Sequence, residues 1–104
     1  MYSCVYVTTK AKKEAQAIAK YLLTKRLVAC ANIFQINSLY RWKGKLESAN
    51  EYAMILKTRT ANLDSVINEI KSKHSYEVPC LISFAINKGN KEFLDWICSE
   101  TSKQ

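Results

Sequence analysis

The sequence predicts a single α+β domain in which two β-α-β units follow one another along the chain. Apolar residues alternate in several short stretches, recur at helical spacing in two longer ones, and flank one glycine-centred turn near the middle. The 104 residues include only two glycines and one proline, so little room is left for long loops or linkers. We therefore treat residues 1–104 as one domain that is large enough to bury a core.

The first half of the chain predicts a strand, a helix and a second strand. Residues 2–8 are strand-like and apolar on both faces, which indicates a central position in a sheet. The period then changes, and a helix is predicted from about Lys10 to about Lys25. Its apolar stripe at i, i+3, i+4 and i+7 consists of Ala15, Ile18, Ala19 and Leu22. Residues 27–36 are apolar again and predict a strand that leads into a hairpin.

Residues 38–47 predict a β-hairpin. Leu39, Tyr40 and Trp42 favour a strand, and the chain should reverse at Gly44, because glycine reaches a positive φ without a steric clash. The hairpin is either an ordinary amphipathic one with packed aromatics and solvated cations, or one that projects and meets another copy of the chain. Residues 47–50 predict an interruption, either a bulge or a second turn.

The second half repeats the plan of the first. Residues 51–58 predict a strand, Thr60 or Asn62 could cap a helix that ends near residue 73, and a polar connection over 74–79 ends at the only proline. Residues 80–86 predict a strand in the centre of the sheet, and a short helix around residues 93–97 ends the domain. The order β-α-β-β-α-β with an added C-terminal helix is the split β-α-β, ferredoxin-like arrangement, with both main helices on one sheet face. The other face needs cover, which association of copies would supply.

Composition, charge and the absence of certain motifs argue against several classes of protein. Hydrophobic residues make up 48% and charged residues 24%, which indicates a globular chain with no membrane-spanning run of about 18 apolar residues. The first residues lack the features of a signal peptide, so a cytoplasmic location is predicted. The net charge of +7 favours anionic partners, but the cations are dispersed and no RNP1-like motif is present, so nucleic acid is not expected. The sequence shows no Cys-His nucleophile pair, no phosphate loop and no paired catalytic carboxylates. An enzyme is therefore not expected.

The cysteines do not show the spacing of a structural zinc site. Cys4, Cys30, Cys80 and Cys98 are scattered, without a CxxC pair. In a reducing compartment each can be a small buried hydrophobic residue.

Five motifs occur in order along nearly the whole chain. They are Ala29-Cys30-Ala31-Asn32-Ile33, the hairpin residues 38–47, Ile55-Leu56-Lys57-Thr58, His74-x-Tyr76-Glu77-Val78-Pro79, and Gly89-Asn90 with Phe93-Leu94-x-Trp96-Ile97. Together they resemble the CutA divalent-cation tolerance family. The resemblance implies a PII-like homotrimer of ferredoxin-like subunits whose long hairpins complete sheets between subunits. It also implies a cytoplasmic role in tolerance of copper and other divalent metals, without an established catalytic activity or an obligatory cofactor.

The resemblance implies a metal site at the histidine motif, and this chain departs from the motif there. Members usually read His-Pro-Tyr-Glu-x-Pro-Glu, whereas this chain has Ser75 and Cys80 in place of the first proline and the last glutamate. A family cysteine late in the first strand corresponds here to Val7, so His74 is the metal residue that carries over. An imidazole suits copper or zinc, and a thiolate at Cys80 would favour Cu(I) or zinc. Cys30, among small residues that suit close packing, ranks below His74, and both Cys80 and His74 can instead be structural.

A second set of motif residues predicts a ligand cleft between subunits. The set consists of Tyr40, Trp42, Lys57, Tyr76, Glu77 and Trp96. Aromatic walls with a few polar groups are typical of small-ligand pockets, and Lys57 could hold a carboxylate or phosphate. Alternatively the aromatics are interface core and Lys57 pairs with Glu77. Two functions remain open: a trimeric metal-binding tolerance protein, and a PII-like sensor of an anionic metabolite or partner protein.

Overall fold

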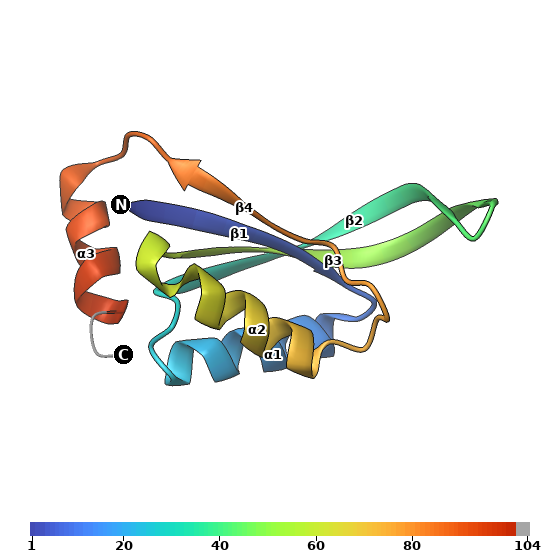
Figure 1. The fold of residues 1–104 in the computed structure, drawn as a ribbon, viewed down its shortest axis with the longest axis horizontal. Helices are drawn as coiled ribbons and strands as arrows, with labels where there is room; N and C mark the ends of the chain where they lie inside the picture. The colour runs from blue at the N-terminus through green and yellow to red at the C-terminus, as the bar shows by residue number, and fades with distance from the viewer. Residues whose placement is uncertain (102–104) are drawn as a thin grey trace.

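The computed structural model describes residues 1–101 as a four-stranded antiparallel sheet with three α-helices (Figure 1). The elements are β1 (Tyr2–Thr9), α1 (Lys12–Thr24), β2 (Cys30–Trp42), β3 (Lys45–Arg59), a 3-10 turn at Thr60–Asn62, α2 (Leu63–Lys73), β4 (Leu81–Ile86) and α3 (Lys91–Thr101). The predicted α+β order with an added C-terminal helix is confirmed. Among the described helices, none is long and apolar enough to cross a membrane.

The strand order in the sheet is β2-β3-β1-β4, and every neighbouring pair is antiparallel. The predicted central position of β1 is confirmed, because β1 pairs with β3 on one side and with β4 on the other. The prediction that residues 80–86 form a central strand is wrong. β3 pairs with one edge of β1 and β4 pairs with the other. No further strand pairs with β4, so β4 is an edge strand of the described single chain.

The core lies between one sheet face and the helices α1 and α2. Val5 and Val7 of β1 and Met54 and Leu56 of β3 alternate toward this side, and none of them is exposed. The helices contribute the apolar stripes that their spacing predicts, Ala15, Ile18, Ala19 and Leu22 from α1 and Val66 and Ile70 from α2. Figure 1 shows both helices on the same side of the sheet. Removal of these apolar side chains from water is the main contribution to the stability of the domain.

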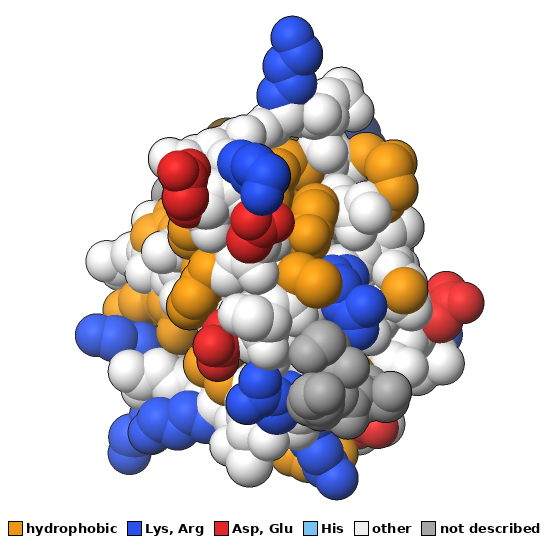
Figure 2. Space-filling view, turned by 90° about the vertical axis from the view of Figure 1, so that its left-hand side faces the viewer, with side chains coloured by type: hydrophobic (Ala, Val, Ile, Leu, Met, Phe, Trp, Pro, Cys, Tyr) orange, Lys and Arg blue, Asp and Glu red, His pale blue; other side chains and the backbone are white. Residues whose placement is uncertain are grey.

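The opposite sheet face is apolar and largely uncovered in the single chain. Ile82 and Phe84 of β4 and Phe34 of β2 are 49%, 56% and 41% exposed. The helix α3 lies at the end of the sheet beside the N-terminus (Figure 1). Figure 2, a view onto that end, shows hydrophobic side chains among Lys, Arg, Asp and Glu side chains of both signs. Exposed apolar area of this kind is typical of a surface that associates with another chain.

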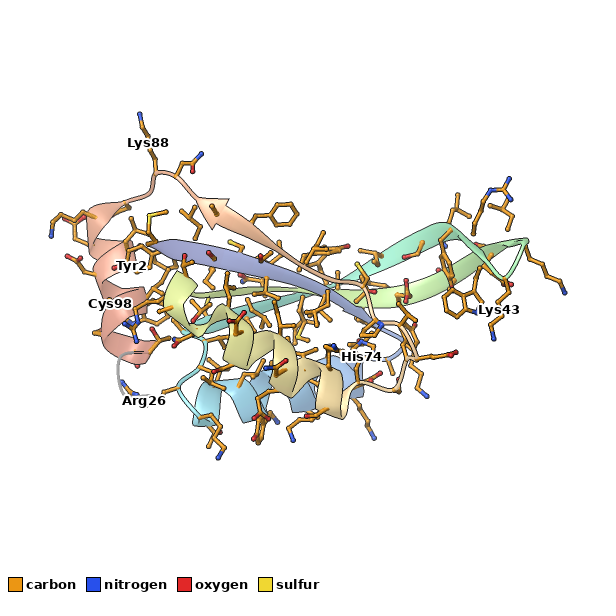
Figure 3. The ribbon with its side chains drawn as sticks, in the orientation of Figure 1. Tyr2, Arg26, Lys43, His74, Lys88 and Cys98 are labelled. Carbon is orange, nitrogen blue, oxygen red and sulfur yellow. The ribbon has the colours of Figure 1, made fainter. Side chains whose placement is uncertain are left out.

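The β2–β3 hairpin extends far beyond the rest of the sheet as a two-stranded arm, with Lys43 at its tip (Figure 3). Lys43 and Gly44 have φ angles of 51° and 79°, the pair of positive values of a two-residue type I′ turn. The prediction of an interruption at residues 47–50 is wrong, since pairing runs unbroken from Cys30 opposite Lys57 to Trp42 opposite Lys45. Polar residues such as Asn50 are tolerated there because the arm is solvated, and Asn37 Nδ2 donates to Asn50 Oδ1 at 3.2 Å.

The capping prediction for α2 is also wrong. Asn62 occupies the N-cap position, but no side-chain hydrogen bond caps the helix. Its Nδ2 instead donates to Thr58 Oγ1 at 3.3 Å and to the carbonyl of Thr101 at 3.5 Å, while Thr60 Oγ1 shares a 2.7 Å hydrogen bond with Ser3 Oγ. Tertiary partners have replaced the local cap, and Asn62 helps to hold the end of α3 against the sheet.

Candidate functional site

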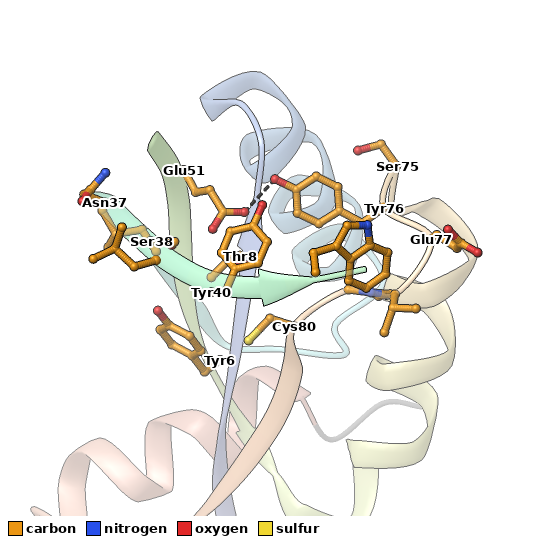
Figure 4. Close-up of a pocket in the computed structure, with 15 residues that line it drawn as sticks. Tyr6, Thr8, Asn37, Ser38, Tyr40, Glu51, Ser75, Tyr76, Glu77 and Cys80 are labelled. Carbon is orange, nitrogen blue, oxygen red and sulfur yellow. Dashed lines mark hydrogen bonds between the residues drawn. The ribbon is translucent and has the colours of Figure 1, made fainter. Parts of the chain in front are cut away.

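An open pocket of about 960 Å³ lies where the arm leaves the sheet (Figure 4). We call it the hairpin-base pocket. Its walls come from the end of β1, from the base of the arm and from the 74–80 connection between α2 and β4. The lining residues are Tyr6, Thr8, Ile36, Asn37, Ser38, Leu39, Tyr40, Trp42, Glu51, Ser75, Tyr76, Glu77, Val78, Pro79 and Cys80.

A tyrosine–carboxylate pair spans this pocket from the connection to the arm. The Tyr76 hydroxyl donates to Glu51 Oε2 at 2.6 Å, and Glu51 is only 5% exposed (Figure 4). Burial, followed by the hydrogen bond to Glu51, raises the pKa of Tyr76 well above its usual value. Tyr76 therefore stays protonated, and its hydroxyl orients the Glu51 side chain at the pocket wall.

His74 holds the connection against β1. Its Nε2 lies 2.7 Å from the carbonyl oxygen of Thr8, and its Nδ1 lies 3.0 Å from the backbone nitrogen of Tyr76. A carbonyl can only accept and an amide N–H can only donate, so these partners fix the tautomer with the proton on Nε2. The ring is completely buried. A metal ion at His74 would have to displace one of these two backbone partners.

Glu14 of α1 fastens the other side of the connection. Its Oε2 accepts from the Ser75 backbone N–H at 2.8 Å, and its Oε1 accepts from the Ser75 hydroxyl at 3.0 Å. The same Oε2 lies 3.8 Å from His74 Nδ1. The serine that replaces the family's proline thus provides two donors to Glu14, a backbone N–H and a hydroxyl, and a proline has neither.

Cys80 contributes a thiol to the pocket at the end of the connection. Partial burial, followed by the negative charge of Glu51, raises the pKa of the Cys80 thiol, and a hydrogen bond with Thr8 acts in the opposite direction. The thiol is therefore protonated at neutral pH and lies within electrostatic reach of Glu51. A cation between the two would favour the thiolate.

The structure brings some of the predicted site residues together and separates the others. Tyr40, Trp42, Tyr76, Glu77 and Cys80 all line the hairpin-base pocket. The rest lie outside the residues that form it.

Lys57 is on the uncovered sheet face, where its Nζ donates to Asn32 Oδ1, and Cys30 is the residue paired with Lys57 on β2. Trp96 lies on α3, with its ring centroid 5.4 Å from that of Phe93. In one chain, these three residues therefore take no part in the pocket.

Glu51 is the charged residue of the described pocket lining that sequence reasoning missed. It directly precedes the apolar run 52–56, where we read it only as the start of a strand. A carboxylate at the edge of an otherwise apolar strand was the available signal, because burial of such a group requires a partner. That partner, Tyr76, lies 25 residues away and is not apparent from the sequence.

The pocket is acidic although the chain is basic. Among the described residues that line it, Glu51 and Glu77 are the charged ones, and neither Lys nor Arg occurs. The whole chain carries a net charge of +7. The described part of a single chain holds no group of three or more His, Cys, Asp or Glu side chains arranged for one metal ion. The two carboxylates, without a Lys or Arg among the described lining residues, give the wall of the pocket a negative charge.

Comparison with known proteins gives consistent results. A family model described as CutA1 divalent ion tolerance protein matches residues 3–100. The divalent-cation tolerance protein CutA of Archaeoglobus fulgidus is 50% identical over 97 residues, which are 93% of this chain and 95% of that protein. The Pyrococcus horikoshii protein of the same name is 37% identical over 99 residues, 95% of this chain and 97% of that protein.

The solved structure of the Archaeoglobus fulgidus protein has the same fold. It superposes with a TM-score of 0.95 at 48% identity, and the match covers 97% of this chain and 99% of that one. That protein is described as a periplasmic divalent cation tolerance protein. The cytoplasmic location predicted for the present chain stays a prediction.

Proposed function

The chain belongs to the CutA1 family of divalent ion tolerance proteins, and on that premise we propose that it binds divalent metal ions, copper among them, at the hairpin-base pocket of a homotrimer. The observation that carries the proposal is the acidic pocket in a basic chain. Glu51 and Glu77 provide carboxylate oxygens without a competing Lys or Arg among the described lining residues. Cys80 adds a soft donor, which raises the affinity for copper and zinc over magnesium and calcium.

His74 has a different place in this proposal from the one its motif implies. Both ring nitrogens have backbone partners, so its role is to hold Tyr76 and the rest of the connection at the pocket. In the pocket, the direct donors that we propose are Glu51, Glu77 and Cys80. Cys30 lies on the sheet face outside the pocket.

The proposed trimer is supported by the free surfaces of the chain. The sheet face opposite α1 and α2 exposes large apolar side chains such as Phe84. β3 pairs with β1 only over Tyr52–Arg59, so residues 45–51 of the arm have one edge without a strand partner in the described chain. Exposed strand edges and apolar faces are both unfavourable in water. Three copies that exchange arms would cover both and would close each hairpin-base pocket into a cleft between subunits.

The aromatic walls support a second function, that of a PII-like sensor. Tyr40, Trp42 and Tyr76 surround a volume that suits a small organic ligand better than a bare ion. An anionic metabolite would need a cation there, and the described lining residues of one chain provide none. In the sensor hypothesis Lys57 of a neighbouring subunit would have to supply it. A cationic ligand requires no such addition, so we favour the metal function.

Native mass spectrometry of the metal-stripped, reduced protein tests the proposal. We expect a trimer that takes up one Cu(II) or Zn(II) per subunit. Glu51→Gln keeps an oxygen acceptor for Tyr76 while it removes the charge, so it should abolish uptake without unfolding the protein. Cys98→Ser, on α3 at the other end of the molecule, is the matched control for Cys80→Ser. Full uptake by Glu51→Gln combined with Cys80→Ser would overturn the metal site, and a monomer would overturn the cleft.

A further inference from the structure

Aromatic rings line the hairpin-base pocket beside its two carboxylates, and this combination fits an organic ligand. The rings belong to Tyr6, Tyr40, Trp42 and Tyr76. The volume of about 960 Å³ lies in the upper part of the range of small-molecule sites, roughly 300–1,000 Å³. A single metal ion leaves most of this volume empty. The pocket thus has room for an apolar body as well as for a charged group.

Trp42 already interacts with one ammonium group. The Nζ atom of Lys43 lies 5.7 Å from the centroid of the Trp42 ring, within the range of a cation–π contact. Lys43 is not among the residues that line the pocket, and it covers at most one face of the ring. Trp42 itself lines the pocket and is 39% exposed. A cation inside the pocket can therefore contact the same aromatic ring.

The Glu51 carboxylate has room for a further hydrogen-bond donor. A carboxylate offers roughly four acceptor positions, and the hydroxyl of Tyr76 fills one of them at Oε2 (Figure 4). Among the described lining residues, no Lys or Arg balances its charge. A largely buried carboxylate is unfavourable until donors and an opposite charge reach it. A positively charged ligand with N–H groups supplies both.

The limited exposure of Glu51 determines which kind of cation suits the pocket. The residue is only 5% exposed, so the group that reaches it must be small. A primary ammonium is compact and donates up to three hydrogen bonds. A quaternary ammonium is bulkier and has no N–H to donate. The geometry therefore favours a primary amine over a quaternary one.

We propose that the hairpin-base pocket binds a primary organic amine in its protonated form, with the ammonium on Glu51 and the apolar body against Tyr40 and Trp42. The exposed Glu77 adds a second negative charge that attracts the ligand. This inference rests on the proposed function, because it uses the same pocket and the same carboxylate. The ammonium and a divalent ion then compete for Glu51, so the amine would regulate metal uptake.

Titration of the metal-stripped protein with benzylamine tests the proposal. Trp96→Leu is the reporter protein, because Trp42 is then the only tryptophan of the chain. We expect a saturable change in the fluorescence of Trp42. Benzyl alcohol and benzoate carry the same ring without a positive charge and should give no such change. Benzyltrimethylammonium has no N–H and should bind about tenfold more weakly or worse. Binding of benzoate or benzyl alcohol as tight as that of benzylamine would overturn the proposal.

Calorimetry with variants identifies the groups that bind the amine. Glu51→Gln should weaken benzylamine binding about tenfold or more, because a hydrogen bond between two charged groups is lost. Trp42→Leu should weaken it about tenfold through the lost cation–π contact. Trp96→Leu is the matched control, because Trp96 on α3 is also 39% exposed and lies outside the pocket. Wild-type affinity in Glu51→Gln would overturn the proposal.

Native mass spectrometry with Zn(II), in the presence and absence of benzylamine, separates this inference from the metal function. Zinc uptake by a protein that does not bind benzylamine would overturn the amine site and leave the metal function standing. Benzylamine binding by a protein that takes up no divalent metal would overturn the metal function and support the amine site. Simultaneous binding of both ligands without competition would overturn the shared use of Glu51.

Discussion

Replacement of His74 tests whether its ring is a structural clamp or a metal ligand. His74→Ala removes the donor to the Thr8 carbonyl and the acceptor of the Tyr76 N–H. A buried polar group that loses its partner costs ~1–3 kcal/mol, so two groups amount to ~2–6 kcal/mol. Because the 74–80 connection is partly exposed and can admit water, we expect the free energy of unfolding to fall by about 3 kcal/mol.

Guanidinium unfolding of the metal-free protein at one fixed subunit concentration is the suitable assay, since bound metal and assembly both shift apparent stability. His74→Gln is the matched control, because its amide can still donate toward Thr8, and we expect it to lose about half as much stability as His74→Ala. His74→Gln should also retain divalent uptake at the hairpin-base pocket. The reasoning is refuted if His74→Ala unfolds at the wild-type midpoint and either variant loses metal binding while it remains a folded trimer.

Two further predictions concern the arm and the pH dependence of the hairpin-base pocket. Gly44→Ala should destabilise the protein by ~1 kcal/mol, measured as a lower guanidinium midpoint, because φ is +79° at that position while the space for a Cβ atom is open. An unchanged midpoint would mean that the turn is not held in this geometry. The pKa of Tyr76 is raised by burial and by its hydrogen bond to Glu51, so the folded state retains a proton that the unfolded state releases above pH ~10. Its contribution to stability is therefore fully present below pH ~10 and lost as the pH rises further, and Tyr76→Phe should flatten the unfolding profile above pH ~10. Equal slopes in the two proteins would contradict this assignment.

Periodicity predicted the elements because it is a local property. The stripe of Ala15, Ile18 and Leu22 and the alternation in β1 each reflect one face of one element packed on the core. Gly44 marked the hairpin turn because a positive φ is a property of the residue itself. The predictions failed where contacts with distant parts of the chain outweighed the local preference of a residue. Asn50 continues a solvated strand instead of interrupting it, and the side chain of Asn62 bonds to Thr58 and Thr101 instead of capping α2.

The amino-acid sequence by itself determined the order of the elements, the hairpin with its glycine turn and the family resemblance, since these follow from neighbouring residues and short motifs. Only the tertiary structure decided which side chains share a site. Glu51 lies beside Tyr76 because the connection folds back on the arm, and His74 has no free ring nitrogen because two backbone groups occupy both. The place of Cys30 opposite Lys57, outside the pocket, depends on the register of β2 and β3. Register is a relation between distant segments, and packing of the whole domain sets it.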